Sequence, residues 1–255
     1  MNYVRGQQAV TFDRFTEQDI LAMLDETGQL SWERTLAFRQ FRFSKRIYVV
    51  LLNDDGELIA VRKTSRKLLA EFSKRYHISD VVLRTIARIG EIHTAYSCTH
   101  GKFKLISTRG GTCADTTWIM AHHINSYGVC PTDQLLTIAF NSKVKIKSDI
   151  SKETLDGRIA DARWMSNYQS GIHRQIDLEY GFCNEDSRDA FYGDQDFHLQ
   201  NGSGDKLYFG IELITNVCQT LHKDEYGSFV DRKRLHAMVA KVLEKGYMGS
   251  GKLPG

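Results

Sequence analysis

This 255-residue chain lacks several features that would assign it to a familiar class of protein. It has only two prolines, Pro131 and Pro254, so its turns must be made by glycine, asparagine and aspartate. No run of about 18 apolar residues occurs, which predicts that no helix crosses a membrane. The opening residues, MNYVRGQQAVTFDRF, lack a charged segment followed by an apolar one, so we expect no secretory signal.

Cysteine is sparse and unpaired in the sequence. The five cysteines are widely scattered and form no C-x-x-C pair; they are Cys98, Cys113, Cys130, Cys183 and Cys218. An odd, dispersed set without a secretory signal is typical of free thiols in a reducing compartment. We therefore expect a cytoplasmic protein without structural disulfides.

The usual motifs of enzyme active sites are also missing. Neither G-x-S-x-G nor H-E-x-x-H occurs, and the loop Arg109-Gly110-Gly111-Thr112 lacks the Gly-Lys-Ser/Thr ending of a phosphate-binding P-loop. We predict a protein that is not an enzyme, with no catalytic residue, no metal and no cofactor.

One stretch, WIMAHHI at residues 118–124, carries residue types that can do chemistry. Cys113, His122, His123 and Cys130 are zinc-ligand types, but gaps of nine and seven residues do not fit the close ligand pairs of structural zinc sites. On a strand, the two adjacent histidines would also point to opposite faces. A Cys/His dyad leaves little local signature and stays open as an alternative. We interpret the stretch as a core strand.

The net charge of +3 conceals an uneven distribution. Residues 34–109 contain 16 Lys and Arg against 6 Asp and Glu, whereas residues 176–231 contain 3 against 12. A basic front half indicates a polyanionic partner, and the acidic back half indicates a different role.

Local patterns predict a mixed chain. Capping residues and apolar spacing predict helices at residues 16–28, 64–76, 79–90, 151–165 and 231–246. Alternating apolar residues predict hairpins turning at residues 53–56 and 141–142 and a strand at KLYFGIELIT, while residues 31–46 fit a helix or a strand. We therefore expect an α+β fold, a twisted, mainly antiparallel sheet with flanking helices.

Two groups of cations are arranged as a nucleic-acid contact would be. In KVKIK, the period of a strand places the lysines on one face and the apolar residues on the other. Upstream, six cations fall within fourteen residues, and Arg109 stands on a glycine-rich loop suited to a narrow minor groove. The predicted DNA contacts are Arg62, Lys63, Arg66, Lys67, Lys74, Arg75, Arg109, Lys143, Lys145 and Lys147.

The order of several segments resembles the ComK family of competence transcription factors. The resemblance is carried by GELIAVRKTSRKLLAEFSKRY, FKLISTRGG, TTWIMAHHINSY, IAFNSKVKIKSDIS and LDGRIADARWM, and it extends from Arg46 to Tyr168. It implies a cytoplasmic transcription activator of DNA-uptake genes that binds A/T-rich promoter boxes, largely through the minor groove and as a homo-oligomer. It also implies a proteolytic adaptor as a further partner, and no membrane. The acidic C-terminal segment predicts a contact surface for another subunit, RNA polymerase or a regulator.

On this basis we expect three regions: an N-terminal helical extension over residues 1–45, a ComK-like DNA-binding core over residues 46–170, and an acidic region with a terminal helix over residues 171–255. Two other function classes stay open. One is a Cys/His or metal-dependent hydrolase or nuclease, and the other is an adaptor whose acidic face binds a basic protein.

Overall fold

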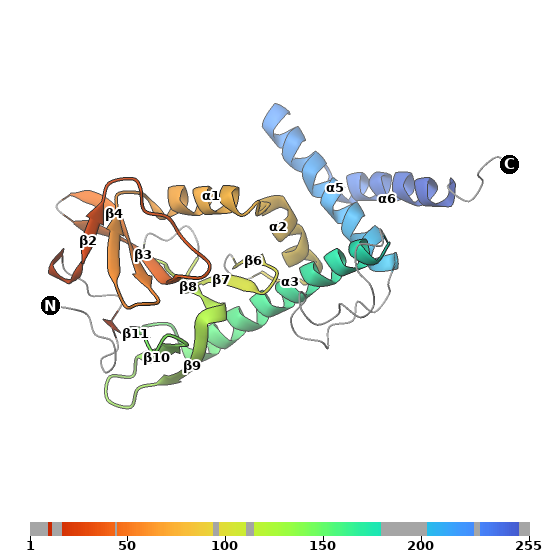
Figure 1. Cartoon of the computed structure of the whole chain (residues 1–255). Helices are drawn as coiled ribbons and strands as arrows, with labels where there is room; N and C mark the ends of the chain where they lie inside the picture. Colours follow the sequence, from red (N-terminus) through yellow and green to blue (C-terminus); the bar gives the residue numbers. More distant parts are fainter. Residues whose placement is uncertain are drawn as a thin grey trace. The chain divides into compact units, whose positions relative to one another are not determined.

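The chain forms two compact units, which are described separately (Figure 1). The computed structural model describes residues 10–11, 17–43, 45–93, 97–110, 115–179, 203–226 and 230–249. The first unit, rich in strands, comprises residues 1–78 and 94–166, and the second, built of helices, comprises residues 79–93 and 167–255.

A seven-stranded sheet dominates the first unit. Its order is β2-β5-β4-β3-β8-β7-β6, and every neighbouring pair is antiparallel except β2 and β5. Strands β3 and β4 form a long hairpin, and β3 also pairs with β8, which lies about 80 residues further along the chain. The strands are β2 (Ala22–Leu24), β3 (Thr35–Phe43), β4 (Arg46–Asn53), β5 (Leu58–Val61), β6 (Ser97–His100), β7 (Phe103–Ser107) and β8 (Thr117–Met120).

A smaller sheet of four strands completes the β structure of this unit, in the order β1-β11-β10-β9. Its central hairpin turns at Asn141–Ser142, as the sequence predicts, and Lys143 takes a left-handed backbone conformation with φ of 70°. The strands are β1 (Val10–Thr11), β9 (Ile124–Val129), β10 (Leu136–Phe140) and β11 (Lys145–Ser148), and single 3-10 turns occur at η1 (Glu17–Asp19) and η2 (Ala121–His123).

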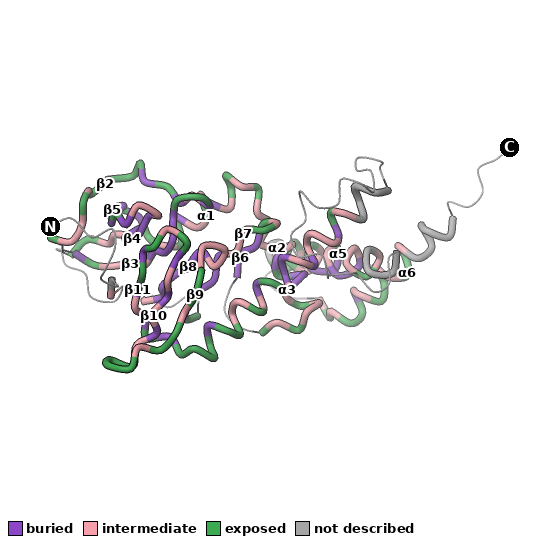
Figure 2. Tube along the Cα trace, turned by 60° about the horizontal axis from the view of Figure 1, so that its bottom comes forward, coloured by how far each residue is buried: buried purple, intermediate pink, exposed green. Residues whose placement is uncertain are grey.

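The main core of the first unit lies between these two sheets. Figure 2 shows buried residues along the strands of both. Alternate residues of the large sheet, such as Val50 and Ile119, join Ile138 and Ile146 of the small sheet in one cluster. Helix α3 (Lys152–Glu179) adds Leu155 and Ala162 from its first turns. Such alternation leaves the opposite side of β11 to its lysines.

Helix α1 (Ser65–Arg75) belongs to the same unit and follows the pattern of its sequence. The Thr64 side chain accepts a hydrogen bond from the Lys67 amide at 3.2 Å, and Leu68 and Phe72 are buried. The Phe72 ring contacts the indole of Trp32, with 4.6 Å between ring centroids. The helix is therefore attached to the sheet through its apolar face.

The second unit is assembled around a buried polar network. Asn216 of α5 (Ser203–Tyr226) donates to Thr85 of α2 (Asp80–Ile89) at 2.6 Å and accepts from Arg232 of α6 (Arg232–Gly249) at 2.8 Å. The carboxylate of Glu212 pairs with Arg232 and lies 2.9 Å from the His236 ring. These contacts satisfy polar groups that burial would otherwise penalise. Among the described residues, no helix is long and apolar enough to cross a membrane.

The structure confirms the α+β class, with a mainly antiparallel sheet and flanking helices. Helices predicted from residues 64, 79, 151 and 231 are present, and Ser79, Ser151 and Asp231 accept the capping hydrogen bonds expected of them. Both predicted hairpins are also confirmed.

Two element predictions are wrong. In residues 16–28 the described part is a 3-10 turn and strand β2, because pairing of residues 22–24 with β5 outweighs the local capping pattern. With β3 also a strand, the described part of residues 1–45 is no helical extension. The segment KLYFGIELIT is helical rather than extended, since Leu207 and Ile211 pack one turn apart against α6.

Two glycines of the first unit, one closely packed and one exposed, provide a test of how tightly its core is packed. Gly28 is buried, and a Cβ added there would lie 2.2 Å from a methyl carbon of Val61, whereas a Cβ at Gly157, an exposed position of α3, would meet nothing within 4 Å. We expect Gly28→Ala to lower the free energy of unfolding by about 1–3 kcal/mol. Gly157→Ala should raise it by about 0.5–1 kcal/mol. Urea denaturation measures both, and a neutral Gly28→Ala would contradict the tight packing of Gly28 on Val61.

Candidate nucleic-acid interface

The outer face of the four-stranded sheet presents lysines among small side chains. Across the strands, Lys145 lies opposite Ala139 and Lys147 lies opposite Thr137, while Val144 and Ile146 are buried on the inner side. The next strand continues these rows with Ser126 and Gly128. We call Lys143, Lys145 and Lys147 the lysine face. Because its neighbours are small and neutral, a phosphate chain could approach the ammonium groups closely.

Two lysines of this face are free of acidic partners within the described part of the chain. Lys143 and Lys145 are exposed and form no ion pair there. Lys147 instead forms an ion pair with Asp133, which raises the pKa of Lys147 and lowers that of Asp133. A phosphate at Lys147 would have to compete with this carboxylate, so Lys143 and Lys145 are the more available contacts.

The upstream cations are divided by their surroundings. Lys63 is buried, with its ammonium nitrogen 2.7 Å from the Glu71 carboxylate and 3.2 Å from the Gly28 carbonyl oxygen, so a phosphate cannot reach it. Arg62 and Lys67 are exposed and lie 3.8 and 3.1 Å from Asp25 and Glu26.

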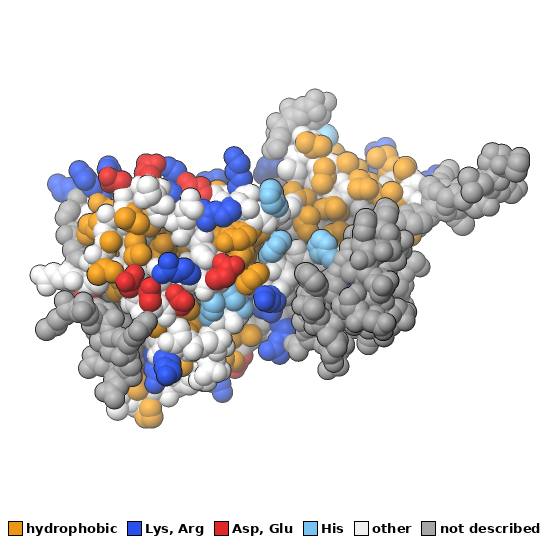
Figure 3. Space-filling view, viewed as in Figure 1, with side chains coloured by type: hydrophobic (Ala, Val, Ile, Leu, Met, Phe, Trp, Pro, Cys, Tyr) orange, Lys and Arg blue, Asp and Glu red, His pale blue; other side chains and the backbone are white. Residues whose placement is uncertain are grey.

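The other predicted DNA contacts outside the lysine face also differ in their surroundings. The Arg75 guanidinium donates to the Leu30 carbonyl at 3.1 Å, and Arg109 pairs with both Asp115 and Asp149. Arg66 and Lys74 are exposed without an ion pair to any described residue. In the view of Figure 3, cationic and acidic side chains alternate over the first unit and form no continuous basic area.

Strand register brings part of this group to one end of the seven-stranded sheet. The hairpin of β3 and β4 closes there at Arg46, and the end of β5 with Arg62 lies beside the start of β4. The loop between β7 and β8, which carries Arg109, lies at this end because residue 117 pairs with Arg39. Gln40 accepts from the amide of Ser65 at 3.1 Å, which places the start of α1 there as well.

The same end carries three cations that sequence reasoning did not select. Arg42, Lys45 and Arg46 surround the turn of the β3–β4 hairpin, and each is exposed with no ion pair to a described residue. A signal existed in the segment FRFSKR, where Arg42 stands between a half-buried and a buried phenylalanine and is followed closely by Lys45 and Arg46. It was missed because residues 31–46 fitted a helix as well as a strand.

The histidines of WIMAHHI have a structural role. Strand β8 ends at Met120, and both imidazoles lie on the turn η2, not on opposite faces of a strand. Their Nε2 atoms lie 2.8 and 2.7 Å from one acceptor, the carbonyl oxygen of Trp32. Nδ1 of His122 accepts from the Lys104 amide at 3.2 Å, so a neutral Nε2–H tautomer satisfies both ring nitrogens.

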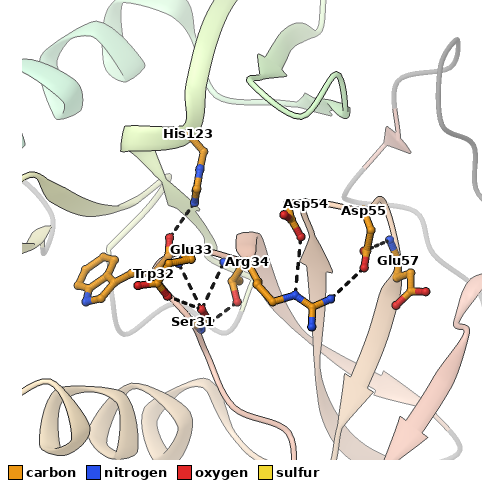
Figure 4. A network of polar contacts seen from close by, with 9 residues as sticks. Ser31, Trp32, Glu33, Arg34, Asp54, Asp55, Glu57 and His123 are labelled. Atoms are coloured by element: carbon orange, nitrogen blue, oxygen red, sulfur yellow. Dashed lines mark hydrogen bonds and ion pairs between the residues drawn. The ribbon is translucent and has the colours of Figure 1, made fainter.

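A polar network fixes the loop that supplies this carbonyl (Figure 4). The Ser31 hydroxyl accepts from the amides of Glu33 and Arg34 at 3.2 and 3.3 Å and donates to the Glu33 carboxylate at 2.8 Å, which lowers the pKa of Glu33. The Arg34 guanidinium lies 3.8 Å from Asp54 and 3.0 Å from Asp55 in the β4–β5 turn. These contacts hold the Trp32 backbone in place for the two histidines.

The described residues offer little support for a Cys/His catalytic dyad or a metal site. Cys113 lies outside the described residues, and Cys130 sits in a loop where its hydrogen bond with Thr132 lowers the pKa of the thiol. Over the described ranges, no group of three or more His, Cys, Asp or Glu side chains could hold a metal ion.

In comparisons with known proteins, no protein-family model, no curated protein and no solved structure matches this chain.

The neutral His122 makes stability depend on pH. Burial lowers the pKa of His122 from 6.5 to about 4. Between these values the unfolded chain binds the extra proton, so stability is full above pH 6.5 and falls as the pH decreases toward 4, by on the order of 2–3 kcal/mol. We expect His122→Gln to destabilise the protein at pH 7.5 and to lose less stability than the wild type between pH 7 and 4.5.

The control is His77→Asn, which removes an exposed imidazole at a position with φ of 53° that asparagine tolerates. Denaturation curves across the pH range measure the effect. Parallel pH profiles for the wild type and His122→Gln would show that His122 is not the titrating group.

Proposed function

We propose that the protein binds double-stranded DNA and acts as a transcription activator, with the lysine face as its main phosphate contact. The observation that carries this proposal is the exposure of Lys143 and Lys145, without acidic partners in the described chain, beside small neutral side chains. Each phosphate neutralised by a lysine releases condensed counterions, and this release supplies most sequence-independent affinity.

Support for a duplex, as opposed to a small anion, comes from the spread of the cations. The lysine face lies on one sheet, whereas Arg42, Lys45 and Arg46 lie on the hairpin of the other, so the basic positions are distributed across the first unit. A single phosphate would be bound by cations that converge on one point. A polymer with a charge every few ångströms can use separated contacts.

The preference for A/T-rich boxes through the minor groove and the activation of DNA-uptake genes rest on the resemblance to ComK alone. Arg109 is the residue that we expect to enter the minor groove. It lies on the loop between β7 and β8, at one end of the seven-stranded sheet. It would have to exchange Asp115 and Asp149 for DNA, and a narrow A/T-rich groove offers a strong negative potential in return.

The lysine face is tested by its contribution to the salt dependence of binding. We expect Lys145→Ala, combined with Lys143→Asn to respect the positive φ, to weaken duplex binding about tenfold or more at moderate salt. The slope of log affinity against log salt should become shallower by about 2, close to one unit for each lost phosphate contact. Fluorescence anisotropy with a labelled duplex measures both quantities.

Lys152→Ala is the matched control, since Lys152 is an exposed cation at the start of α3. It should leave the affinity nearly unchanged. If the lysine double variant binds like the wild type while Arg42→Gln with Arg46→Gln abolishes binding, the contact surface is the β3–β4 hairpin. Absence of duplex binding by the wild type, or affinity that does not fall with salt, would contradict the proposed function.

Base preference is a separate expectation. Unlabelled duplexes carrying A/T-rich boxes should compete at least tenfold better than G/C-rich duplexes of equal length, because only the A/T-rich minor groove is narrow and strongly negative. Arg109→Lys should reduce this preference more than it reduces binding to G/C-rich DNA. Equal competition by both duplexes would contradict the proposed recognition of A/T-rich boxes but would be consistent with DNA binding that does not depend on sequence.

A further inference from the structure

The hairpin of α5 and α6 exposes large apolar side chains on one flank. Ile214 and Val217 are each 39% exposed, Leu221 62%, Met238 59% and Val242 65%. Figure 3 shows hydrophobic side chains gathered over these two helices. Single exposed apolar residues are common, but a set drawn from two adjacent helices calls for an explanation.

Helix geometry places these five residues on a common side. Ile214, Val217 and Leu221 are three and four positions apart, so they form one stripe along α5. Met238 and Val242 are four positions apart and form a matching stripe on α6. We call these five residues the apolar flank.

Two other sides of the hairpin are already occupied. Ile211 of α5 packs with Leu235 and Val239 of α6 between the two helices. On the flank toward α2, Glu212 binds both Arg232 and His236 of α6. The polar network and the apolar flank therefore lie on opposite sides of the hairpin.

We propose that the apolar flank is a homodimer interface, in which two copies of the α5–α6 hairpin stack face to face as a four-helix bundle. This surface lies outside the stretch that resembles ComK and does not depend on DNA binding. A second copy of the chain can cover the apolar flank, because a twofold axis brings the same flank of each copy into contact and each apolar patch then buries the other.

The area of the flank fits this assembly. Its five side chains expose on the order of 500 Å² of apolar surface, which is near the upper limit for the largest patch of a monomer. A standard interface buries about 800 Å² on each partner, of which an apolar centre is roughly this size and a polar rim supplies the rest. Stacked helices would bury the flank in the manner of a bundle core.

Two hairpins can stack with each helix on its own copy, or with α5 of one copy on α6 of the other, and charge distinguishes these two arrangements. Arg234 and Lys241 are exposed and lie four residues before and three residues after Met238, so they line the outer edge of the flank on α6. Placing α6 on its own copy would bring these cations together. Placing α5 of one copy on α6 of the other avoids that repulsion.

Sedimentation equilibrium and light scattering across a protein concentration series test the proposal. We expect the full-length wild type to approach twice the mass of the 29.2 kDa chain at micromolar concentrations. Leu221→Glu and Val242→Glu should each weaken dimerisation by at least a hundredfold. Both positions are well exposed in the single chain, so circular dichroism and thermal melting of the diluted variants should match those of the diluted wild type.

Ala237→Glu is the matched control, because Ala237 is exposed on α6 and, at 100° per residue, points away from the flank. It should dimerise like the wild type. A monomeric wild type at high concentration, or dimers that survive both glutamate substitutions, would overturn the proposal. Co-sedimentation of a monomeric wild type with anionic phospholipid vesicles would assign the flank to a lipid surface instead.

Discussion

The first unit depends on the pairing of β3 with both of its neighbours. One edge of β3 continues into β4 through a hairpin, and the other edge binds β8 through residues 37–39 and 117–119. Without this second ladder, β6, β7 and β8 would have no connection to the rest of the seven-stranded sheet. Backbone groups buried in such a sheet must be paired, so a strand in the middle position is obligatory. Every candidate contact on this sheet is positioned by the registers that β3 sets.

Neighbouring groups, more than sequence position, determine what each cation can do. Lys63 is enclosed with Glu71, Lys147 is paired with Asp133, and Lys145 is free of such a partner in the described chain, although all three have the same chemical group. An ammonium group that already has a carboxylate gains less from a phosphate, because the first ion pair must be broken. The proposed interface is accordingly smaller than the basic composition of residues 34–109 indicates.

The second unit shows how one helical hairpin can separate two kinds of surface. Buried Asn216 and Glu212 require exact partners, and α2 and α6 supply them in Thr85, Arg232 and His236. The apolar flank requires only area and shape, which a second copy can provide. The two proposals together predict that a dimer contacts DNA twice in one complex, with the second contact intramolecular.

Sequence alone determined the features that depend on neighbours within a few residues. These include the caps of α1, α2, α3 and α6, the two hairpin turns and the alternation that exposes Lys145 above buried Ile146. Tertiary structure decided what depends on partners far along the chain: β2 replaced a locally favoured helix by pairing with β5, and α5 replaced a strand by packing on α6. It also gave His122 and His123 a shared acceptor some 90 residues away, since a side chain's hydrogen-bond partner is set by the fold and not by spacing.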